Sequence, residues 1–222
     1  MTPAFDWGPL GLSLQLATVT TLILLLIGVP LAWWLARTRV RWVAVPEAVV
    51  SLPLVLPPTV LGFYFLLLLS PNGTIGGWLN DVFDVRLVFS FPGLVIASVL
   101  YGLPFMVHPV QAGLRALPPS LREAAWLMGR GRWRTLLEVE LPNIRPALLT
   151  GAVLTFAHAI GEFGVVLMIG GNLPGRTRVA SIAIFDAVER MDYALAHRYA
   201  LILLALSFTI LVTVFTLNRR RP

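Results

Sequence analysis

Long apolar blocks alternate with polar segments along the whole chain. Each of the five blocks is close to, or longer than, the roughly 20 residues that a helix needs to cross a hydrocarbon core of about 30 Å. We interpret each block as one membrane-spanning helix. The pattern therefore predicts an all-α polytopic membrane protein with about five transmembrane helices, in one domain of residues 1–222. The blocks comprise residues 10–36, 44–69, 88–110, 147–170 and 199–217.

Prolines interrupt the second block, at Pro46, Pro53, Pro57 and Pro58. A proline lacks a backbone donor and kinks or ends a helix. One interpretation is a single kinked span. The other is a broken or re-entrant segment, whose freed carbonyl groups are tolerated only inside protein or beside a water-filled path. The second interpretation allows a sixth span and puts Pro57, Pro58 and Thr59 at a translocation path.

The composition excludes several functional classes. Hydrophobic residues make up 57% of the chain and charged residues 13%, with a mean hydropathy of +0.82, which excludes an ordinary soluble domain. The chain has no cysteine, so disulfides, thiolate nucleophiles and cysteine-ligated metal sites are excluded. All 17 basic residues are arginines, and most flank the apolar blocks. The net charge of +6 therefore indicates membrane topology, and nucleic acid is not an expected partner.

The arginines are divided unevenly between alternate polar segments. If the N-terminus is external, 12 arginines lie in the cytoplasmic segments 37–43, 111–146 and 218–222, and five lie in the external segments 70–87 and 171–198. Because arginine-rich loops stay in the cytoplasm, this bias predicts an external N-terminus, a cytoplasmic C-terminus and an odd number of spans. The residues before the first block include no basic residue, so we expect that block to remain as a helix and not to be cleaved as a signal peptide.

The cytoplasmic segment 111–146 contains clear helix signals. Ser120 and Glu123 have the spacing of a capping box, in which each side chain bonds a backbone amide of the other residue. Gly129 and Gly131 can end the helix and form a turn at little steric cost. We therefore expect a short helix that starts near Ser120 and stops at the two glycines.

A second short helix is expected from about Arg132 to near Leu141, because Pro142 disfavours helical geometry in the residue before it. The two helices would form a compact helix-turn-helix under the membrane. Their apolar side chains either dock a partner or pack beneath the bundle as an interfacial helix, and the sequence leaves both interpretations open. These side chains are Trp126, Leu127, Trp133, Leu136 and Leu137, beside the small Ala124 and Ala125.

This segment resembles the EAA motif of ABC importer permeases. The matching residues, at the family's spacing, are Glu123, Ala124, Ala125, Gly129, Val139, Leu141 and Pro142. The resemblance implies that the segment is a coupling helix, which sits in a cleft of a cytoplasmic ATPase, and that these residues serve ATPase coupling. Val139 departs from the isoleucine that is commonest at its position.

Two further stretches resemble the oxyanion branch of these permeases, especially molybdate and tungstate permeases. They are LPLVLPPTVLG at residues 52–62 and IGEFG at residues 160–164, which GNLPGRT follows at residues 171–177. Sulfate permeases share a similar Gly-Glu-aromatic-Gly stretch but are usually longer. The resemblance therefore implies molybdate import across the inner membrane of a bacterial-type cell, with tungstate or sulfate as alternative cargo.

The resemblance also implies an assembly. Two permease copies would surround a central path, with two ATPase subunits below them and a soluble molybdate-binding protein outside. The chain contains no G-x-x-x-x-G-K-[ST] sequence, so we expect the partner ATPase to bind ATP and Mg²⁺. On this chain we expect no cofactor, no metal site and no catalytic residue. The chain would thus be a transporter subunit and not an enzyme.

Glu162 is the only acidic residue well inside an apolar block, where a charge is costly. One interpretation is structural: Glu162 bonds backbone or a neighbouring helix, and Gly161 and Gly164 let helices come close. The other is a gate, in which Glu162 holds one state of the path and His158 and Gly164 also lie at the path or gate. His158, one turn earlier on the same helix face, is its nearest partner in the sequence. A carboxylate that binds a dianion directly is disfavoured, because like charges repel.

Two rival functions use the same residues. A secondary transporter would show intramembrane ionisable groups and inverted repeats, and only His158 and Glu162 fit the first criterion, with no repeat visible. An intramembrane enzyme would need a metal-binding pattern such as H-E-x-x-H or a second ligand cluster, and the sequence contains neither.

Overall fold

The computed structural model describes residues 5–38 and 40–219, and within these ranges the chain forms helices and no strand. The predicted all-α class is confirmed. The helices are α1 (Gly8–Arg37), α2 (Ala44–Val55), α3 (Pro58–Leu69), α4 (Thr74–Phe83), α5 (Phe91–Ala116), α6 (Pro119–Leu127), α7 (Arg132–Thr135), the π-helical turn η1 (Leu136–Glu140), α8 (Leu141–Asn143), α9 (Arg145–Gly161), α10 (Gly164–Gly170), α11 (Ala180–Glu189) and α12 (Tyr193–Arg219).

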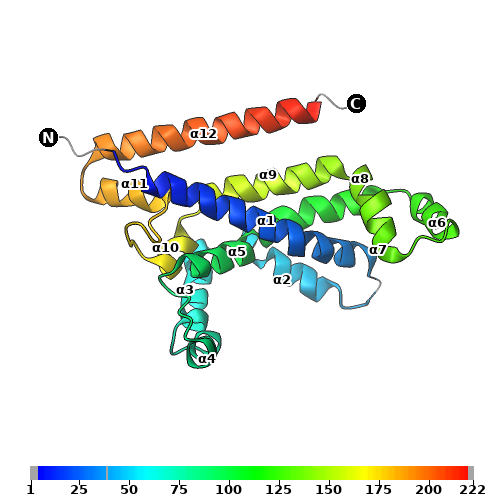
Figure 1. Cartoon of the computed structure of the whole chain (residues 1–222), viewed down its shortest axis with the longest axis horizontal. Coiled ribbons are helices and arrows are strands. Elements are labelled where there is room, and N and C mark those ends of the chain that lie inside the picture. The colour runs from blue at the N-terminus through cyan, green and yellow to red at the C-terminus, as the bar shows by residue number, and fades with distance from the viewer. Residues whose placement is uncertain (1–4, 39, 220–222) are drawn as a thin grey trace.

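The centre of the molecule is α5, along which α1 and α9 pack (Figure 1). Two glycines allow α1 and α5 to approach closely. A Cβ atom on Gly28 would lie 3.0 Å from the side chain of Met106, and one on Gly102 would lie 3.0 Å from the side chain of Leu24. Met106 and Leu24 are themselves fully buried. Small residues at such crossings are the usual means of tight helix packing in membranes, where apolar side chains gain little by leaving lipid.

Among the described residues the number of candidate spans is four, or five if one bent pair of helices is a single span, compared with the expected five. Four helical stretches are long and apolar enough to cross a membrane: α1, Pro58–Phe83, which contains α3 and α4, α5, and the Tyr193–Thr213 part of α12. Arg132–Asn143 and α9 meet at an angle of 81° and supply a fifth if the bent pair is one span.

The last helix, α12, lies along one side of the bundle (Figure 1). α12 contacts mainly α11 and, to a smaller extent, α9. Leu204 and Phe208 are exposed on it. Exposed apolar side chains on a long apolar helix suit contact with lipid, since no hydration penalty arises there.

The second apolar block is two helices and not one span. α2 stops at Val55, and Leu56 and Pro57 take extended backbone conformations before α3 starts at Pro58. The cause is local: Pro57 restricts the residue before it, and Pro58 suits the first position of a helix because it has no amide to bond. Each helix has 12 residues. At 1.5 Å per residue each is about 18 Å long, too short to span alone.

The fourth block is also broken, which the interpretation of one uninterrupted span did not anticipate. α9 ends at Gly161, and Glu162 and Phe163 have non-helical backbone angles before α10 begins at Gly164. The carbonyl oxygen of Glu162 accepts a hydrogen bond of 2.6 Å from the Ser181 hydroxyl instead of a helical amide. A side chain from a distant segment thus compensates the break.

Both segments expected to be external contain a helix. α4 lies in the segment between the second and third blocks, and α11 lies between the fourth and fifth. The start of α1, α11 and the start of α12 lie at one end of the molecule, whereas the end of α1, the helices α6 to α8 and the end of α12 lie at the other (Figure 1). This polarity agrees with the arginine distribution, although Arg39, Arg220 and Arg221 lie outside the described residues.

Candidate coupling loop and translocation path

The first helix of the loop, α6, begins one residue earlier than expected. Its N-cap is Pro118, its first residue is Pro119, and no side chain caps it. The predicted capping box of Ser120 and Glu123 is therefore wrong, because Ser120 already lies inside the first turn. Pro119 explains the shift: its ring sets a helical φ angle, and its missing amide would have had no partner at this position.

α6 ends at the expected glycine. Gly129 has φ of +76°, a conformation that residues with a Cβ atom seldom adopt. The amides of Gly129 and Arg130 donate to the carbonyl oxygens of Trp126 and Ala125, at 2.9 and 3.1 Å. These bonds satisfy carbonyl groups that the helix end leaves free. No atom lies within 4 Å of a Cβ added to Gly129, so the backbone angle alone explains the glycine.

The second helix of the loop runs past Pro142 and does not end near Leu141 as expected. α7 continues through the π-helical turn η1 into α8, which ends at Asn143. A π-helical turn has one residue more than an α-helical turn, so it accommodates a proline that cannot donate to the preceding turn. The same turn directs Leu136 and Glu140 into the protein, and both are buried.

Glu140 joins the loop to two long helices. It is 2% exposed and accepts from the Arg37 Nη2 atom at 2.6 Å and from the Trp33 Nε1 atom at 2.8 Å, both on α1. Arg37 also donates to the carbonyl oxygen of Leu114 on α5 at 3.0 Å. The Nε atom of Arg122 on α6 lies 3.9 Å from the Glu140 carboxylate. This cluster connects α6 and η1 to the ends of α1 and α5.

The outer surface of the loop exposes several large apolar side chains, as expected, beside charged ones such as Arg134 and Glu138. Leu136 is the exception to that expectation, because η1 turns it inward. Of the two alanines, Ala125 is buried and Ala124 is exposed. A surface of this kind usually marks contact with a partner. Its exposed large side chains are Trp126, Leu127, Met128, Trp133 and Leu137.

The breaks in the second and fourth blocks meet in space. A Cβ atom on Gly164 would lie 2.8 Å from the Pro58 Cβ atom and 3.4 Å from the Thr59 amide nitrogen, so only glycine fits at this position. A Cβ atom on Gly62 would similarly lie 2.8 Å from the Met168 Cβ atom. α3 and α10 thus pack against each other directly after the two breaks. The structure brings together Pro58, Thr59 and Gly164, which the sequence analysis assigned to the path.

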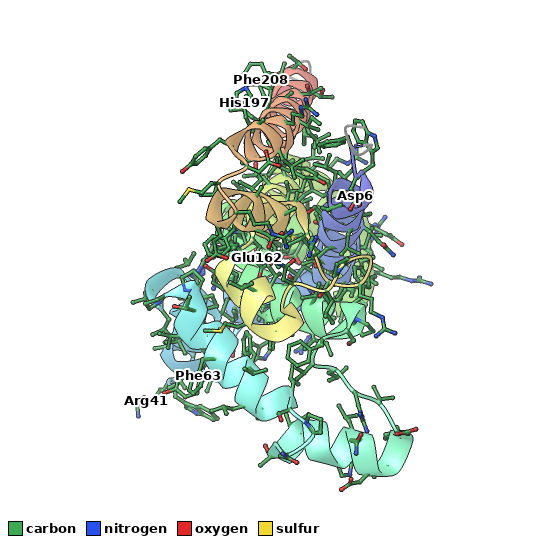
Figure 2. The ribbon with its side chains drawn as sticks, turned by 90° about the vertical axis from the view of Figure 1, so that its left-hand side faces the viewer. Asp6, Arg41, Phe63, Glu162, His197 and Phe208 are labelled. Atoms are coloured by element: carbon green, nitrogen blue, oxygen red, sulfur yellow. The ribbon has the colours of Figure 1, made fainter. Side chains whose placement is uncertain are left out.

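Glu162, at the second break, is 4% exposed and lies in the middle of the molecule (Figure 2). Its Oε2 atom accepts from the Ser98 hydroxyl of α5 at 2.6 Å. Its Oε1 atom is buried and has no hydrogen-bond partner among the described residues. The expected bond to a neighbouring helix is therefore present. Gly161, in contrast, has no neighbour within 4 Å of an added Cβ, so it is not a site of close approach.

His158 is not the partner of Glu162. Its ring stacks on Phe105 with centroids 4.0 Å apart and an interplanar angle of 22°, and lies 4.8 Å from the ring of Tyr101. The expected shared helix face does not exist, because α9 ends at Gly161 between the two residues. The His158 Nε2 atom is buried without a hydrogen-bond partner in the described part of the chain.

Sequence reasoning missed Ser98, Ser181, Arg37, Trp33 and Glu140. Ser98 lies in an apolar block and Ser181 in a polar segment, and a hydroxyl group in either place is common and gives no signal of its own. Glu140 did have a signal in the sequence. It follows Leu136 by four residues, so on a helix the acidic side chain lies on the same face as a leucine, in a segment that must pack under the bundle.

This chain is similar to several known membrane transport proteins. The family model described as binding-protein-dependent transport system inner membrane component matches residues 28–220. The molybdenum transport system permease protein ModB of Azotobacter vinelandii is 48% identical, over 96% of this chain and 95% of that protein. The sulfate transport system permease protein CysT of Escherichia coli (strain K12) is 37% identical, over 87% of this chain and 69% of that protein. A crystal structure of a bacterial alginate ABC transporter, in complex with an alginate pentasaccharide-bound periplasmic protein, contains a chain with a TM-score of 0.80 and 18% identity, over 99% of this chain and 80% of that one.

Proposed function

The chain belongs to the family of binding-protein-dependent transport system inner membrane components, and from this premise we propose that it is the membrane-spanning subunit of an ATP-driven molybdate importer. The observation that carries the choice of cargo is the 48% identity to a molybdenum transport permease over nearly the full length of both chains. Identity to the sulfate permease is 37%, over 69% of that protein. Sulfate, which is also a tetrahedral dianion, is the second candidate, and tungstate is the third.

The proposed assembly has two copies of this chain, two cytoplasmic ATPase subunits and an extracytoplasmic binding protein. The chain contains no lysine and hence no Walker-type phosphate loop, which supports binding of ATP and Mg²⁺ by the ATPase subunits. The N-terminus would be external and the loop cytoplasmic, as the arginine bias suggests. The exposed apolar surface of the loop supports contact with the ATPase, because such a surface is unfavourable in water.

Movement of the ATPase subunits would reach the membrane through Glu140. This residue links the loop to Arg37 and Trp33 on α1, and Arg37 links onward to α5. A buried charged contact resists separation, since breaking it leaves unpaired charge. The loop and the ends of α1 and α5 would therefore move as one body between inward-facing and outward-facing states.

The path would pass the two helix breaks, where Pro57, Pro58 and Thr59 are exposed on the isolated chain and Gly164 packs against them. Exposed non-helical backbone at membrane depth is tolerated beside a water-filled cavity. Glu162 lies just behind this region and bonds Ser98 of α5. We assign Glu162 to holding one state of the path and not to binding the anion, because a carboxylate repels a dianion.

Reconstitution tests the proposal. The chain is placed in proteoliposomes with its ATPase and binding protein, and ATP hydrolysis and uptake are measured with molybdate, tungstate or sulfate. We expect molybdate-loaded binding protein to give the largest stimulation. If sulfate-loaded binding protein stimulated ATP hydrolysis more than molybdate-loaded binding protein, the chain would be assigned to sulfate import. Purification of an active transporter that needs no ATPase partner would favour a secondary transporter and contradict the proposal.

A further inference from the structure

A cavity of about 560 Å³ lies between the end of α1 and the two helices of the loop. It is separate from the helix breaks of the proposed path. Its walls include Trp33, Trp34 and Arg37 from α1, Arg122, Glu123 and Trp126 from α6, and Arg132 from α7. Leu127 and Leu137 on the exposed apolar surface do not line it. The cavity thus borders the docking surface and shares Trp126 with it.

The cavity has an excess of positive charge. Three arginines and two glutamates line it. One of the glutamates, Glu140, is already engaged by Arg37 and Trp33. The Nε atoms of Arg37 and Arg122 are buried and have no hydrogen-bond partner among the residues that the structure describes. Buried donors of this kind are usually satisfied in native proteins, so the pairing of these two guanidinium groups within the described residues is incomplete.

The tryptophans beside the cavity suit the depth of a lipid headgroup. Trp33 and Trp34 belong to the last turns of α1, a helix long and apolar enough to span a membrane. Tryptophan gathers at the boundary between hydrocarbon and water, because its ring is apolar and its N–H group is polar. Trp34 and Trp126 are both about half exposed and form aromatic rims of the opening. Basic pockets between helices at this level suit anionic headgroups.

We propose that this cavity binds one phosphate-type anion, supplied by the headgroup of an anionic phospholipid. Arg122 and Arg132 would contact the phosphate oxygens, since guanidinium groups match tetrahedral oxyanions in geometry and charge. The cavity is larger than one phosphate ion needs and leaves room for the glycerol part of a headgroup. A lipid held there would brace α6 and α7 against α1. The inference stands independently of the cargo assigned above.

Thermal unfolding of the purified full chain in a neutral detergent tests the proposal. Dioleoylphosphatidylglycerol, dioleoylphosphatidylcholine or inorganic phosphate is added, and the shift in Tm is measured for each. We expect a rise in Tm with phosphatidylglycerol that is at least about twice the rise with phosphatidylcholine, because specific binding stabilises the folded state. Native mass spectrometry should show one phosphatidylglycerol retained per chain.

Matched variants locate the site. Arg132→Gln removes a lining arginine, whereas Arg134→Gln removes an exposed arginine of the same helix that does not line the cavity. We expect the difference between the two lipids to disappear in Arg132→Gln, to persist in Arg134→Gln and to be retained in part by Arg132→Lys, which keeps the charge. Equal loss in both glutamine variants, or no difference between the lipids in the wild type, would overturn the site. A rise with inorganic phosphate alone, at the size seen with phosphatidylglycerol, would keep the anion site but overturn its assignment to a lipid.

Discussion

Two buried glutamates, one in the coupling loop and one at the break between α9 and α10, are held in opposite ways. Glu140 has both carboxylate oxygens bonded, one to the Arg37 guanidinium and the other to the Trp33 ring nitrogen. Glu162 has one oxygen bonded to the Ser98 hydroxyl and the other without a partner in the described residues. Similar burial is therefore combined with two different kinds of bonding. Paired charge makes a rigid connection, whereas a single bond to a neutral hydroxyl can be exchanged at little cost.

This difference fits the proposed roles of the two regions. A loop that transmits movement from an ATPase must not slip against the membrane helices, and the Glu140 cluster spans α1, α5 and the loop. A gating residue must exchange its hydrogen-bond partners between the two states. Glu162 lies at the break between α9 and α10, where the backbone angles are not helical. The predictions below are ordered from the largest expected effect to the smallest.

Glu140→Gln should have the largest effect. It keeps the size of the side chain and an acceptor for Trp33, but it leaves the partly buried Arg37 without a carboxylate partner. Loss of one member of a buried ion pair costs about 3–5 kcal/mol. We expect the free energy of unfolding in mixed micelles to fall by about this amount and uptake to be lost.

Glu138→Gln is the matched control for that variant. Glu138 lies in the same turn and pairs with Arg130, but both side chains are partly exposed to solvent. Surface pairs contribute about 0–1 kcal/mol, so stability and uptake should stay near those of the wild type. Equal losses in the two variants would mean that the buried position of Glu140 is not what matters.

Gly129→Val tests whether uptake depends on the backbone conformation of the turn after α6, as we expect it to depend on the charge of Glu140. Valine at a φ of +76° is strained, by about 1–3 kcal/mol. We expect the protein to insert into the membrane while uptake falls on the order of tenfold or more, because α6 no longer points correctly. Gly131 has φ of −69° and open space around it, so Gly131→Ala should transport normally. Normal uptake by the valine variant would contradict the coupling role of the turn.

The two regions also differ in how far the sequence predicted them. In the loop, Gly129 and the two short helices were predicted because backbone rules act over a few residues. The predicted capping box is wrong because Pro119 starts the helix before Ser120. The predicted helix end at Leu141 is wrong because the π-helical turn η1 accommodates Pro142 within the helix. Local rules identify which residues can start or stop a helix, but they do not decide between neighbouring signals.

The helix breaks were harder to predict from sequence. The prolines of the second block signalled a break as one of two interpretations, whereas the fourth block contains no proline at Glu162. That break depends on Ser181 and Ser98, which lie 19 and 64 residues away in the chain. The meeting of Gly164 with Pro58 is likewise a contact between distant segments. Hydrophobic periodicity contains no information about such partners.

Glu162→Leu should have a smaller effect than Glu140→Gln, since only a neutral hydroxyl loses its acceptor. Ser98 is fully buried, and a buried unpaired hydroxyl costs about 1–3 kcal/mol. We expect the leucine variant to lose that much stability and most of its uptake. Glu162→Gln can still accept from Ser98 and should keep assembly and part of the transport.

A double-variant cycle separates this bond from other effects of the leucine. If the contact with Ser98 is the main loss, Ser98→Ala combined with Glu162→Leu should be no less stable than Glu162→Leu alone. Strictly additive losses, or wild-type transport by the leucine variant, would show that the bond has neither a structural nor a gating role.

His158→Phe should have the smallest effect and sharpens the contrast between the two glutamates. The imidazole makes a stacked contact with Phe105, and its Nε2 atom is buried without a hydrogen-bond partner among the described residues. Phenylalanine keeps the stacked ring and removes a polar atom that gains nothing from its surroundings, and such a replacement is nearly neutral or stabilising. We expect stability to change by less than about 0.5 kcal/mol and uptake to stay within about twofold of the wild type. His158→Ala removes the ring and should cost more, by the cavity that it leaves. Loss of uptake in a stable phenylalanine variant would assign the imidazole to the path and make His158, and not Ser98 alone, a partner of the gate.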